Sequence, residues 1–217
     1  MMTDEVRPAP PLADPAPLGL GAFALTTFLL SAHNAFGPTS VPLLAFFGVA
    51  IFYGGLGQFL AGMMEFRNRN VFGATAFSTY GAFWMGLAAF VGLVLLGKVA
   101  TAEVAPSLAW ILLAFAIFNT YMLLWSSRVS VAVFMVFLTL ELTEILLSIG
   151  NFNGAAAGSG LTALGGYMGI VTAAVAWYAS AAGVVNGMAG HPVLPVGHPF
   201  WGETAAAPSA MTRPAGA

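Results

Sequence analysis

The chain has no cysteine and very little charge. Among its 217 residues, Lys and Arg together number 6, Asp and Glu number 8, and the formal net charge is −2. The lack of cysteine excludes disulfides and thiolate chemistry. Hydrophobic residues make up 59% of the sequence and charged residues 6%, whereas in an ordinary soluble domain about a quarter of the residues are charged. The composition therefore excludes a typical soluble protein.

Motifs for catalysis or for metal binding are scarce as well. The histidines are His33, His191 and His198, which are not spaced as a metal cluster, and no nucleophile–base motif stands out. The one lysine, Lys98, lies between two apolar runs, which argues against a retinal Schiff base inside a bundle. No glycine-rich phosphate loop precedes a helix in a soluble segment. We therefore expect no enzyme activity, no metal and no cofactor.

Long apolar runs are abundant and predict an all-α membrane protein with six transmembrane helices. Each run has about the length that a helix needs to cross a hydrocarbon core of roughly 30 Å, and none alternates as a membrane β-strand would. They define a six-helix domain over residues 18–190, between an N-terminal tail (1–17) and a flexible C-terminal tail (191–217). The runs are Leu18–Ala35, Pro42–Met64, Phe72–Leu96, Ser107–Trp125, Val129–Ile149 and Leu161–Gly187.

The basic residues predict the orientation of the spans. With six spans, both tails and the second and fourth gaps share one side, which holds every arginine, whereas the opposite gaps offer only Lys98. The positive-inside rule therefore places both termini in the cytoplasm of a multi-pass plasma-membrane protein. Residues 1–14 form a poor n-region for a cleaved signal peptide, so we expect the first run to remain as a span.

Polar side chains inside the spans are the most informative ones, because helices already satisfy their backbone groups. Phe23, Thr27, Ser31 and Asn34 fall on one face of the first span and could line a narrow aqueous path. The alternative is that the hydroxyl groups bond to their own helix or to a neighbouring one.

Glycines accompany a lone amide in the second span and recur in the sixth. Gly54, Gln58 and Gly62 share a helical face, and the sixth span contains two GxxxG pairs, Gly165/Gly169 and Gly183/Gly187. Small residues allow helices to approach closely. We expect these positions to serve tight bundling or oligomer contacts.

Glu141 and Glu144 are the sharpest anomaly, since both lie near the middle of the fifth span. An ionised carboxylate is costly at that depth unless water or a partner reaches it. The functional interpretation is proton exchange or a cation site. The alternative is that the two side chains face an oligomeric cavity or hydrogen-bond between helices.

The segment Asp14–Leu20 joins the polar tail to the first apolar run. Asp14 followed by Pro15 predicts a helix N-cap and first helical residue, because proline costs little where the N–H has no intrahelical partner. Such a helix start favours an anion.

Several ordered strings resemble the acetate uptake transporter family of bacteria and fungi, which includes succinate–acetate permeases. The resemblance covers roughly residues 14–197, and the opening string resembles the family's Asn-Pro-Ala-Pro-Leu-Gly-Leu. The matching strings are Asp14–Leu20, Thr26-Thr27, His33-Asn34, Ile51–Gln58, Phe72–Trp84, Gly150-Asn151 and Ala176–Ala179.

The resemblance implies a homohexamer in which each protomer has its own pathway for small carboxylates. It implies a hydrophobic constriction at Phe23, Tyr80 and Leu140. The resulting hypothesis is a transporter or channel for acetate and related mono- and dicarboxylates, assisted by protons. The remaining positions expected along the pathway are Asp14 and Leu18 at its cytoplasmic mouth and Thr27, Asn34, Gln58 and Asn119 as hydrogen-bonding groups.

Two departures from the family pattern add negative charge. Asp14 stands where the family usually has Asn, and Glu141 and Glu144 stand where relatives usually carry uncharged residues, which suggests protonation as part of the cycle. Two other functions stay open. One is transport of another small solute such as ammonium, to which yeast relatives have been linked, and the other is a non-transporting membrane sensor or scaffold.

Overall fold

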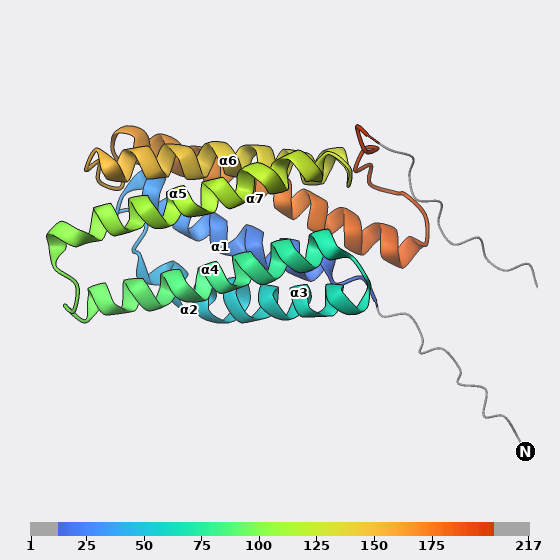
Figure 1. Cartoon of the computed structure of the whole chain (residues 1–217), viewed down its shortest axis with the longest axis horizontal. Coiled ribbons are helices and arrows are strands. Elements are labelled where there is room, and N and C mark those ends of the chain that lie inside the picture. Colours follow the sequence, from blue (N-terminus) through green and yellow to red (C-terminus); the bar gives the residue numbers. More distant parts are fainter. Residues whose placement is uncertain (1–12, 202–217) are drawn as a thin grey trace, which may run out of the picture.

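The computed structural model describes residues 13–201, which contain helices and loops and no strand. Six of its helical segments are long and apolar enough to cross a membrane, which confirms the six predicted spans (Figure 1). The second span consists of three successive elements. The elements are α1 (Ala16–Phe36), α2 (Leu44–Ile51), η1 (Phe52–Gly57), α3 (Gln58–Arg67), α4 (Val71–Leu95), α5 (Thr101–Ser126), α6 (Val131–Phe152) and α7 (Gly160–Ala189).

The start of α1 differs by one residue from the prediction. The N-cap position is Pro15 rather than Asp14, and the first helical residue is Ala16. The Asp14 side chain still supports the first turn, because its Oδ1 accepts a hydrogen bond of 2.9 Å from the Ala16 N–H. Pro17 also lies in that turn, where proline costs little because an N–H at this position would have no intrahelical partner.

The second span is interrupted by a π-helical turn, which the sequence did not predict. η1 lies between α2 and α3, and such wide turns are frequent at functional sites. A Cβ atom on Gly54 would overlap the Thr26 side chain of α1, so glycine is required for this close approach. The turn is followed at once by Gln58, whose side chain is only 1% exposed.

Helix α7 packs along α1, and their contact is the most extensive in the protein. Ideal Cβ atoms on Gly166 and Gly169 would overlap Ala35 and Ser31 of α1, and one on Gly183 would lie 2.8 Å from Pro17. The prediction that glycines in this span serve tight bundling is confirmed at Gly169 and Gly183, whereas Gly166 was not singled out from the sequence. At Gly187 a Cβ would meet nothing within 4 Å.

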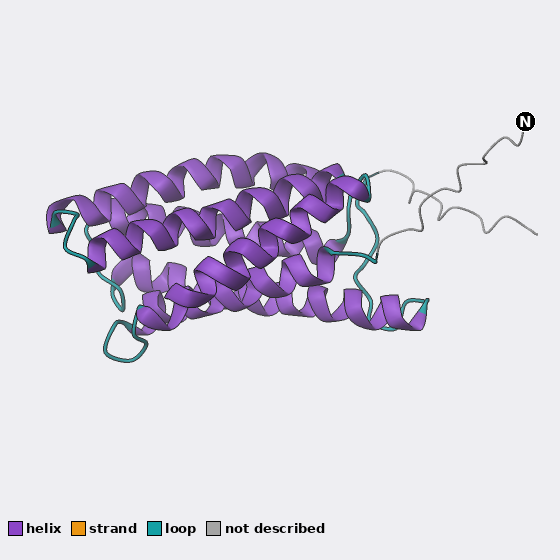
Figure 2. Cartoon of the chain, turned by 90° about the horizontal axis from the view of Figure 1, so that it is seen from below, coloured by secondary structure: helices purple, strands orange, loops and turns teal. Residues whose placement is uncertain are grey.

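The helices leave a gap along the middle of the bundle that only side chains fill. No Cα atom of α6 lies within 8 Å of a Cα atom of α1 or α4. Helices α5 and α7, in contrast, both pack directly on α6. Aromatic rings bridge the gap, for example Phe72 of α4 and Phe137 of α6, whose centroids lie 5.3 Å apart. The views in Figures 1 and 2 show the long helices running side by side along the bundle.

The described parts of both tails lie at the same end of the bundle (Figure 1). Residues 191–201 fold back on the helices there: the Ala132 N–H donates to the Val196 carbonyl at 2.9 Å, and the Phe200 N–H donates to the Ser127 carbonyl at 2.8 Å. The Tyr178 hydroxyl donates to the Pro195 carbonyl at 2.6 Å. The rest of the predicted C-terminal tail, and residues 1–12 of the N-terminal tail, lie outside the described residues.

Candidate functional site

Three hollows follow one another along the gap between α1 and α6. The first, of about 180 Å³, includes Asp14 and Leu20 among its lining residues and is called the tail-side hollow. The second has only about 20 Å³ and is lined by Leu20 and Phe23 of α1 and by Leu140 of α6. The third, the distal hollow, has about 420 Å³ and begins at Leu30. The order along α1 is the same as the order along α6, so the three hollows lie in series between these helices.

The smallest of the three hollows brings together the residues that the resemblance assigns to a constriction. Phe23, Tyr80 and Leu140 all line it, and their side chains are 4%, 3% and 5% exposed. The rings of Phe23 and Tyr80 meet edge to face, with centroids 5.7 Å apart. Three further aromatic rings, those of Phe83, Phe115 and Phe118, pack around Tyr80. The three residues come together from α1, α4 and α6 and close the path with apolar surface.

A polar network lies beside the constriction and joins α4, α5 and α6. The Tyr80 hydroxyl lies 3.0 Å from Asn119 Oδ1 and 3.3 Å from Glu144 Oε1. Asn119 Nδ2 donates to the Phe137 carbonyl at 3.0 Å and to Glu141 Oε2 at 2.6 Å. Thr120, which the sequence did not single out, donates to Glu141 Oε1 at 2.8 Å. The amide of Asn119 therefore links Tyr80 to Glu141, whereas Glu144 is contacted by the Tyr80 hydroxyl directly.

Three buried oxygen atoms around the constriction have no hydrogen-bond partner among residues 13–201. They are Thr27 Oγ1, Gln58 Oε1 and Glu144 Oε2. Gln58 lines the constriction itself. Thr27 and Glu144 each lie one helical turn beyond a residue of the constriction, on the side of the distal hollow. Because buried polar groups are normally paired, these atoms are candidates for contacts with a solute.

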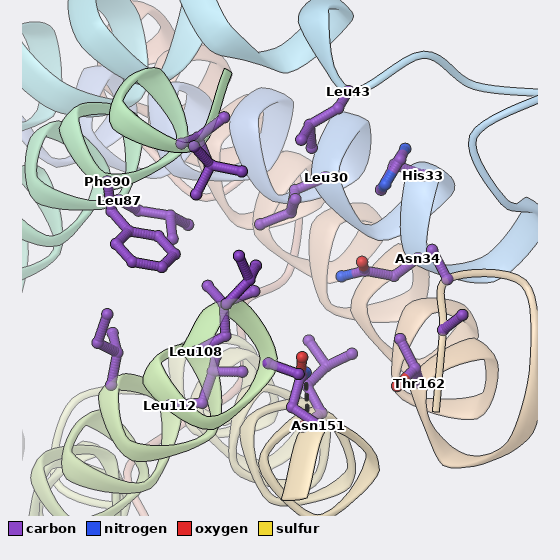
Figure 3. A pocket seen from close by; sticks show the side chains of 18 of the residues that line it. Leu30, His33, Asn34, Leu43, Leu87, Phe90, Leu108, Leu112, Asn151 and Thr162 are labelled. Atoms are coloured by element: carbon purple, nitrogen blue, oxygen red, sulfur yellow. Dashed lines mark hydrogen bonds between the residues drawn. The ribbon is translucent and has the colours of Figure 1, made fainter. Parts of the chain in front are cut away.

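The distal hollow is mostly apolar, with amide groups at its edge. Asn34 of α1 and Asn151 of α6 both line it, and Figure 3 shows the Asn34 amide pointing into the space. The Asn151 Nδ2 is already engaged, because it donates to the Leu147 carbonyl at 2.8 Å. Asn34 thus borders the distal hollow, toward the end of α1 opposite to Asp14.

The tail-side hollow contains one predicted residue and lacks another. Asp14 lines it, together with Val196 from the segment that folds back after α7. Leu18 is 44% exposed and lines none of the three hollows. The covering segment could not be found from the sequence, because its Pro- and Gly-rich composition is equally typical of a free tail.

The remaining acidic and metal-ligating side chains of the described residues complete the description of the site. Within residues 13–201, no three His, Cys, Asp or Glu side chains are grouped as metal ligands. Glu65 at the end of the second span is a further buried acid, 1% exposed, that the sequence analysis did not single out. It lies against Gly73 at the start of α4, where a carboxylate is favourable.

Comparisons with known proteins identify relatives over most of the chain. The model of the GPR1/FUN34/yaaH family matches residues 4–198. "Accumulation of dyads protein 2" of Saccharomyces cerevisiae is 42% identical over 83% of this chain, and the match spans 65% of that protein. The "Succinate-acetate/proton symporter SatP" of Escherichia coli is 37% identical over 86% of this chain and 96% of its own length.

A solved structure has the same fold. The structure of the bacterial acetate channel SatP aligns with a TM-score of 0.79 and 36% sequence identity, covering 86% of this chain and all of that one. The agreement extends over the six-helix domain.

Proposed function

The chain belongs to the GPR1/FUN34/yaaH family, and on that premise we propose that it is a membrane transporter or channel for acetate and related small mono- and dicarboxylates. The observation that carries the proposal is the path of three hollows, narrowed to about 20 Å³ at Phe23, Tyr80 and Leu140. The relatives named as a succinate–acetate symporter and an acetate channel support the class of solute. Transport, rather than catalysis, is the activity that this arrangement suits.

The walls of the path divide into three parts with different tasks. Asp14 lies at the tail-side entrance, where an anionic side chain competes with an incoming anion for the first N–H groups of α1. The constriction excludes water and large solutes. Beyond it, Asn34 offers an amide to a carboxylate in the distal hollow. Gln58 lines the constriction and replaces part of the water that the solute loses there, whereas Asn119 is engaged with Tyr80, Phe137 and Glu141 and holds the wall behind it.

A small carboxylate needs such a pathway because its anion crosses lipid poorly. Carboxylic acids of this kind resemble the Asp and Glu side chains, which are mostly ionised near pH 7. Moving an unpaired charge into an apolar medium is far more costly than moving a neutral polar group. A narrow passage with a few hydroxyl, amide and carboxyl groups lowers that cost without admitting bulk water.

The test is uptake of labelled acetate into proteoliposomes, corrected for protein-free liposomes. We expect saturable uptake that unlabelled acetate and succinate inhibit. Uptake no faster than in protein-free liposomes would overturn the proposal. Uptake that is inhibited by ammonium and not by carboxylates would favour ammonium as the solute. Normal uptake by the Phe23→Ala and Leu140→Ala variants would show that the solute does not cross at this constriction.

The proposal extends to the surroundings of the protein. We place it in the plasma membrane with both described chain ends on the cytoplasmic side, because the arginines of the second and fourth gaps lie on that side.

We also propose the homohexamer that the family resemblance implies. Large apolar side chains such as Trp110, Ile117 and Leu124 are exposed on α5 and suit contact with lipid or with another protomer. Native mass spectrometry in detergent tests the oligomeric state.

A further inference from the structure

Thr27 and Glu144 occupy the step between the constriction and the distal hollow. On α1, Thr27 lies between Phe23 of the constriction and Leu30 of the distal hollow. On α6, Glu144 holds the corresponding place between Leu140 and Leu147. Their side chains are 4% and 3% exposed, and each has an oxygen atom with no partner in the described part of the chain. A solute that enters the constriction from the distal hollow must pass these two groups.

The hydrogen-bond network assigns the proton of the Tyr80 hydroxyl. Both protons of the Asn119 amide nitrogen are used, one on the Phe137 carbonyl and one on Glu141. Asn119 Oδ1 can only accept, so its contact of 3.0 Å with Tyr80 uses the single hydroxyl proton of Tyr80. Glu144 Oε1 lies farther from the same hydroxyl, at 3.3 Å.

An ionised Glu144 would therefore be almost without donors. Its Oε1 would compete for a proton that Tyr80 gives to Asn119, and its Oε2 has no partner within residues 13–201. A protonated Glu144 removes this shortage of hydrogen-bond donors, because its O–H can donate to the free lone pair of the Tyr80 oxygen. The geometry thus suits a neutral carboxyl that holds a proton beside the path.

The neighbouring carboxyl is in a different position. Glu141 Oε2 accepts from Asn119 at 2.6 Å, and Oε1 lies 2.8 Å from the Thr120 hydroxyl, whose single proton is shared with the Ala116 carbonyl at 2.9 Å. Around Glu144 the titratable groups are Tyr80 on α4 and Glu141 on the same helix. Helix α5 contributes the neutral Asn119 to the network, and α7 approaches α6 nearby with Thr172, which is hydrogen-bonded to Thr143. No basic side chain takes part in these contacts among the described residues.

Resting on the proposed function, we infer that Glu144 is the proton-carrying group of this transporter. When a carboxylate reaches the inner end of the distal hollow, the Glu144 O–H gives up its hydrogen bond to the Tyr80 oxygen and donates to the solute, to which the Thr27 hydroxyl donates as well. The Glu144 O–H bond then breaks, the proton forms a new O–H bond on the solute, and the neutral acid passes the apolar constriction. The Glu144 carboxylate regains a proton from hydronium that reaches the distal hollow. One proton moves with each carboxylate group that crosses.

The proton transfer suits both the energetics and the chemistry of the site. The two partners are carboxyl groups with similar intrinsic acidity, so a transfer between them beside the constriction exchanges one desolvated carboxylate for another. A neutral acid costs far less to desolvate at the constriction than its anion. Glu141, which Asn119 and Thr120 contact, positions Asn119 and is not needed for the transfer.

The test compares two driving forces in proteoliposomes that contain the full chain. One is an inward proton gradient at zero membrane potential, and the other is a potassium diffusion potential at equal pH. Initial rates of labelled acetate uptake are taken above those of protein-free liposomes. For the wild type we expect stimulation by the proton gradient, up to about tenfold per pH unit, and no response to the potential. If the bare anion moved instead, uptake would respond to the potential. The ratio of internal to external acetate at equilibrium would then shift by roughly fifty-fold per 100 mV.

Variants assign the effect to Glu144. We expect Glu144→Gln, which keeps the shape and cannot release a proton, to lose stimulation by the proton gradient. Glu144→Asp keeps a carboxyl and should retain it, and so should the control Glu65→Gln, which neutralises a buried acid that lines none of the three hollows. Stimulation that persists in Glu144→Gln, or that is lost in Glu144→Asp as well, would overturn the inference.

The wild type alone also decides the matter if a variant does not fold. Uptake by the wild type that follows the membrane potential and not the proton gradient would overturn the role of Glu144 while leaving carboxylate transport intact. A wild type without any uptake would overturn the proposed function itself. The two failures are therefore distinguishable.

Discussion

The two sides of the bundle are built differently. Between α1 and α7, small residues bring the helices into close contact along most of their length. Between α4 and α5 the contact is sparse, and hollows of about 420 and 580 Å³ border these helices. The α1–α7 contact holds Phe23 in place from one side, whereas the side chains of α4 and α5 close the path from the other. A rigid wall facing a loosely packed one is a suitable construction for a pathway with a narrow closure.

The largest effect is expected from disrupting the α1–α7 contact. In Gly166→Val, the new side chain would overlap the backbone of Ala35, and the overpacking should cost about 3 kcal/mol or more. We expect little folded protein by size-exclusion chromatography and thermal unfolding in detergent. Gly187→Ala is the control, since a Cβ there meets nothing within 4 Å. Equal yields and midpoints for both variants would contradict the importance of the contact.

This contact was partly predictable from the sequence. The GxxxG pair Gly165/Gly169 predicts a helix face without side chains, but the structure places Gly165 against Leu147 of α6 and only Gly169 against Ser31 of α1. The six spans follow from hydropathy in the same way, because a membrane leaves the backbone few alternatives. Phe23, Tyr80 and Leu140 were grouped through the family resemblance, and the structure brings them to one hollow.

Other parts of the path depend on contacts that a single sequence does not encode. The π-helical turn before Gln58 arises from the fit of Gly54 against Thr26 of another helix, which no local pattern announces. The different surroundings of Glu141 and Glu144 depend on where Asn119 and Thr120 of α5 lie. The Asp14 cap was displaced by one residue because helix ends are the least sharply specified positions.

A smaller effect is expected on the loosely packed side, at the amide that joins its helices. Asn119→Leu removes hydrogen bonds to Tyr80, Phe137 and Glu141. Interhelical hydrogen bonds in membranes average about 0.6 kcal/mol each, so we expect a loss of about 2 kcal/mol. The thermal midpoint in detergent should fall by about 4–8 °C.

The control for Asn119→Leu is Thr120→Val, which removes one bond to Glu141 from an exposed position. Its midpoint should fall by no more than about a third as much. If the two variants are equally stable, Asn119 does not hold α4, α5 and α6 together.

The next effect concerns the closure itself. Leu140→Ala shortens one wall of a hollow of about 20 Å³, so the barrier at the constriction should fall. A decrease of 1.4 kcal/mol corresponds to about a tenfold faster initial rate of acetate uptake, and bulkier carboxylates should gain more than acetate. Leu142→Ala, on the same helix and 43% exposed, should leave the rates unchanged. Unaltered rates in Leu140→Ala would place the narrowest point elsewhere.

The smallest effect is expected in the distal hollow, where the walls are far apart. Asn34→Leu removes an amide that points into about 420 Å³ of space (Figure 3), and one such contact with a hydrated anion is worth about 0.6–1 kcal/mol. The half-saturating acetate concentration should therefore rise about three- to fivefold with little change in maximal rate. Asn151→Leu should have a weaker effect, because the Asn151 amide nitrogen is already bonded to the Leu147 carbonyl. Equal effects of the two variants would mean that both amides bind the solute. A fall in the maximal rate of Asn34→Leu alone would mean that Asn34 contacts the solute at the constriction rather than at the entrance.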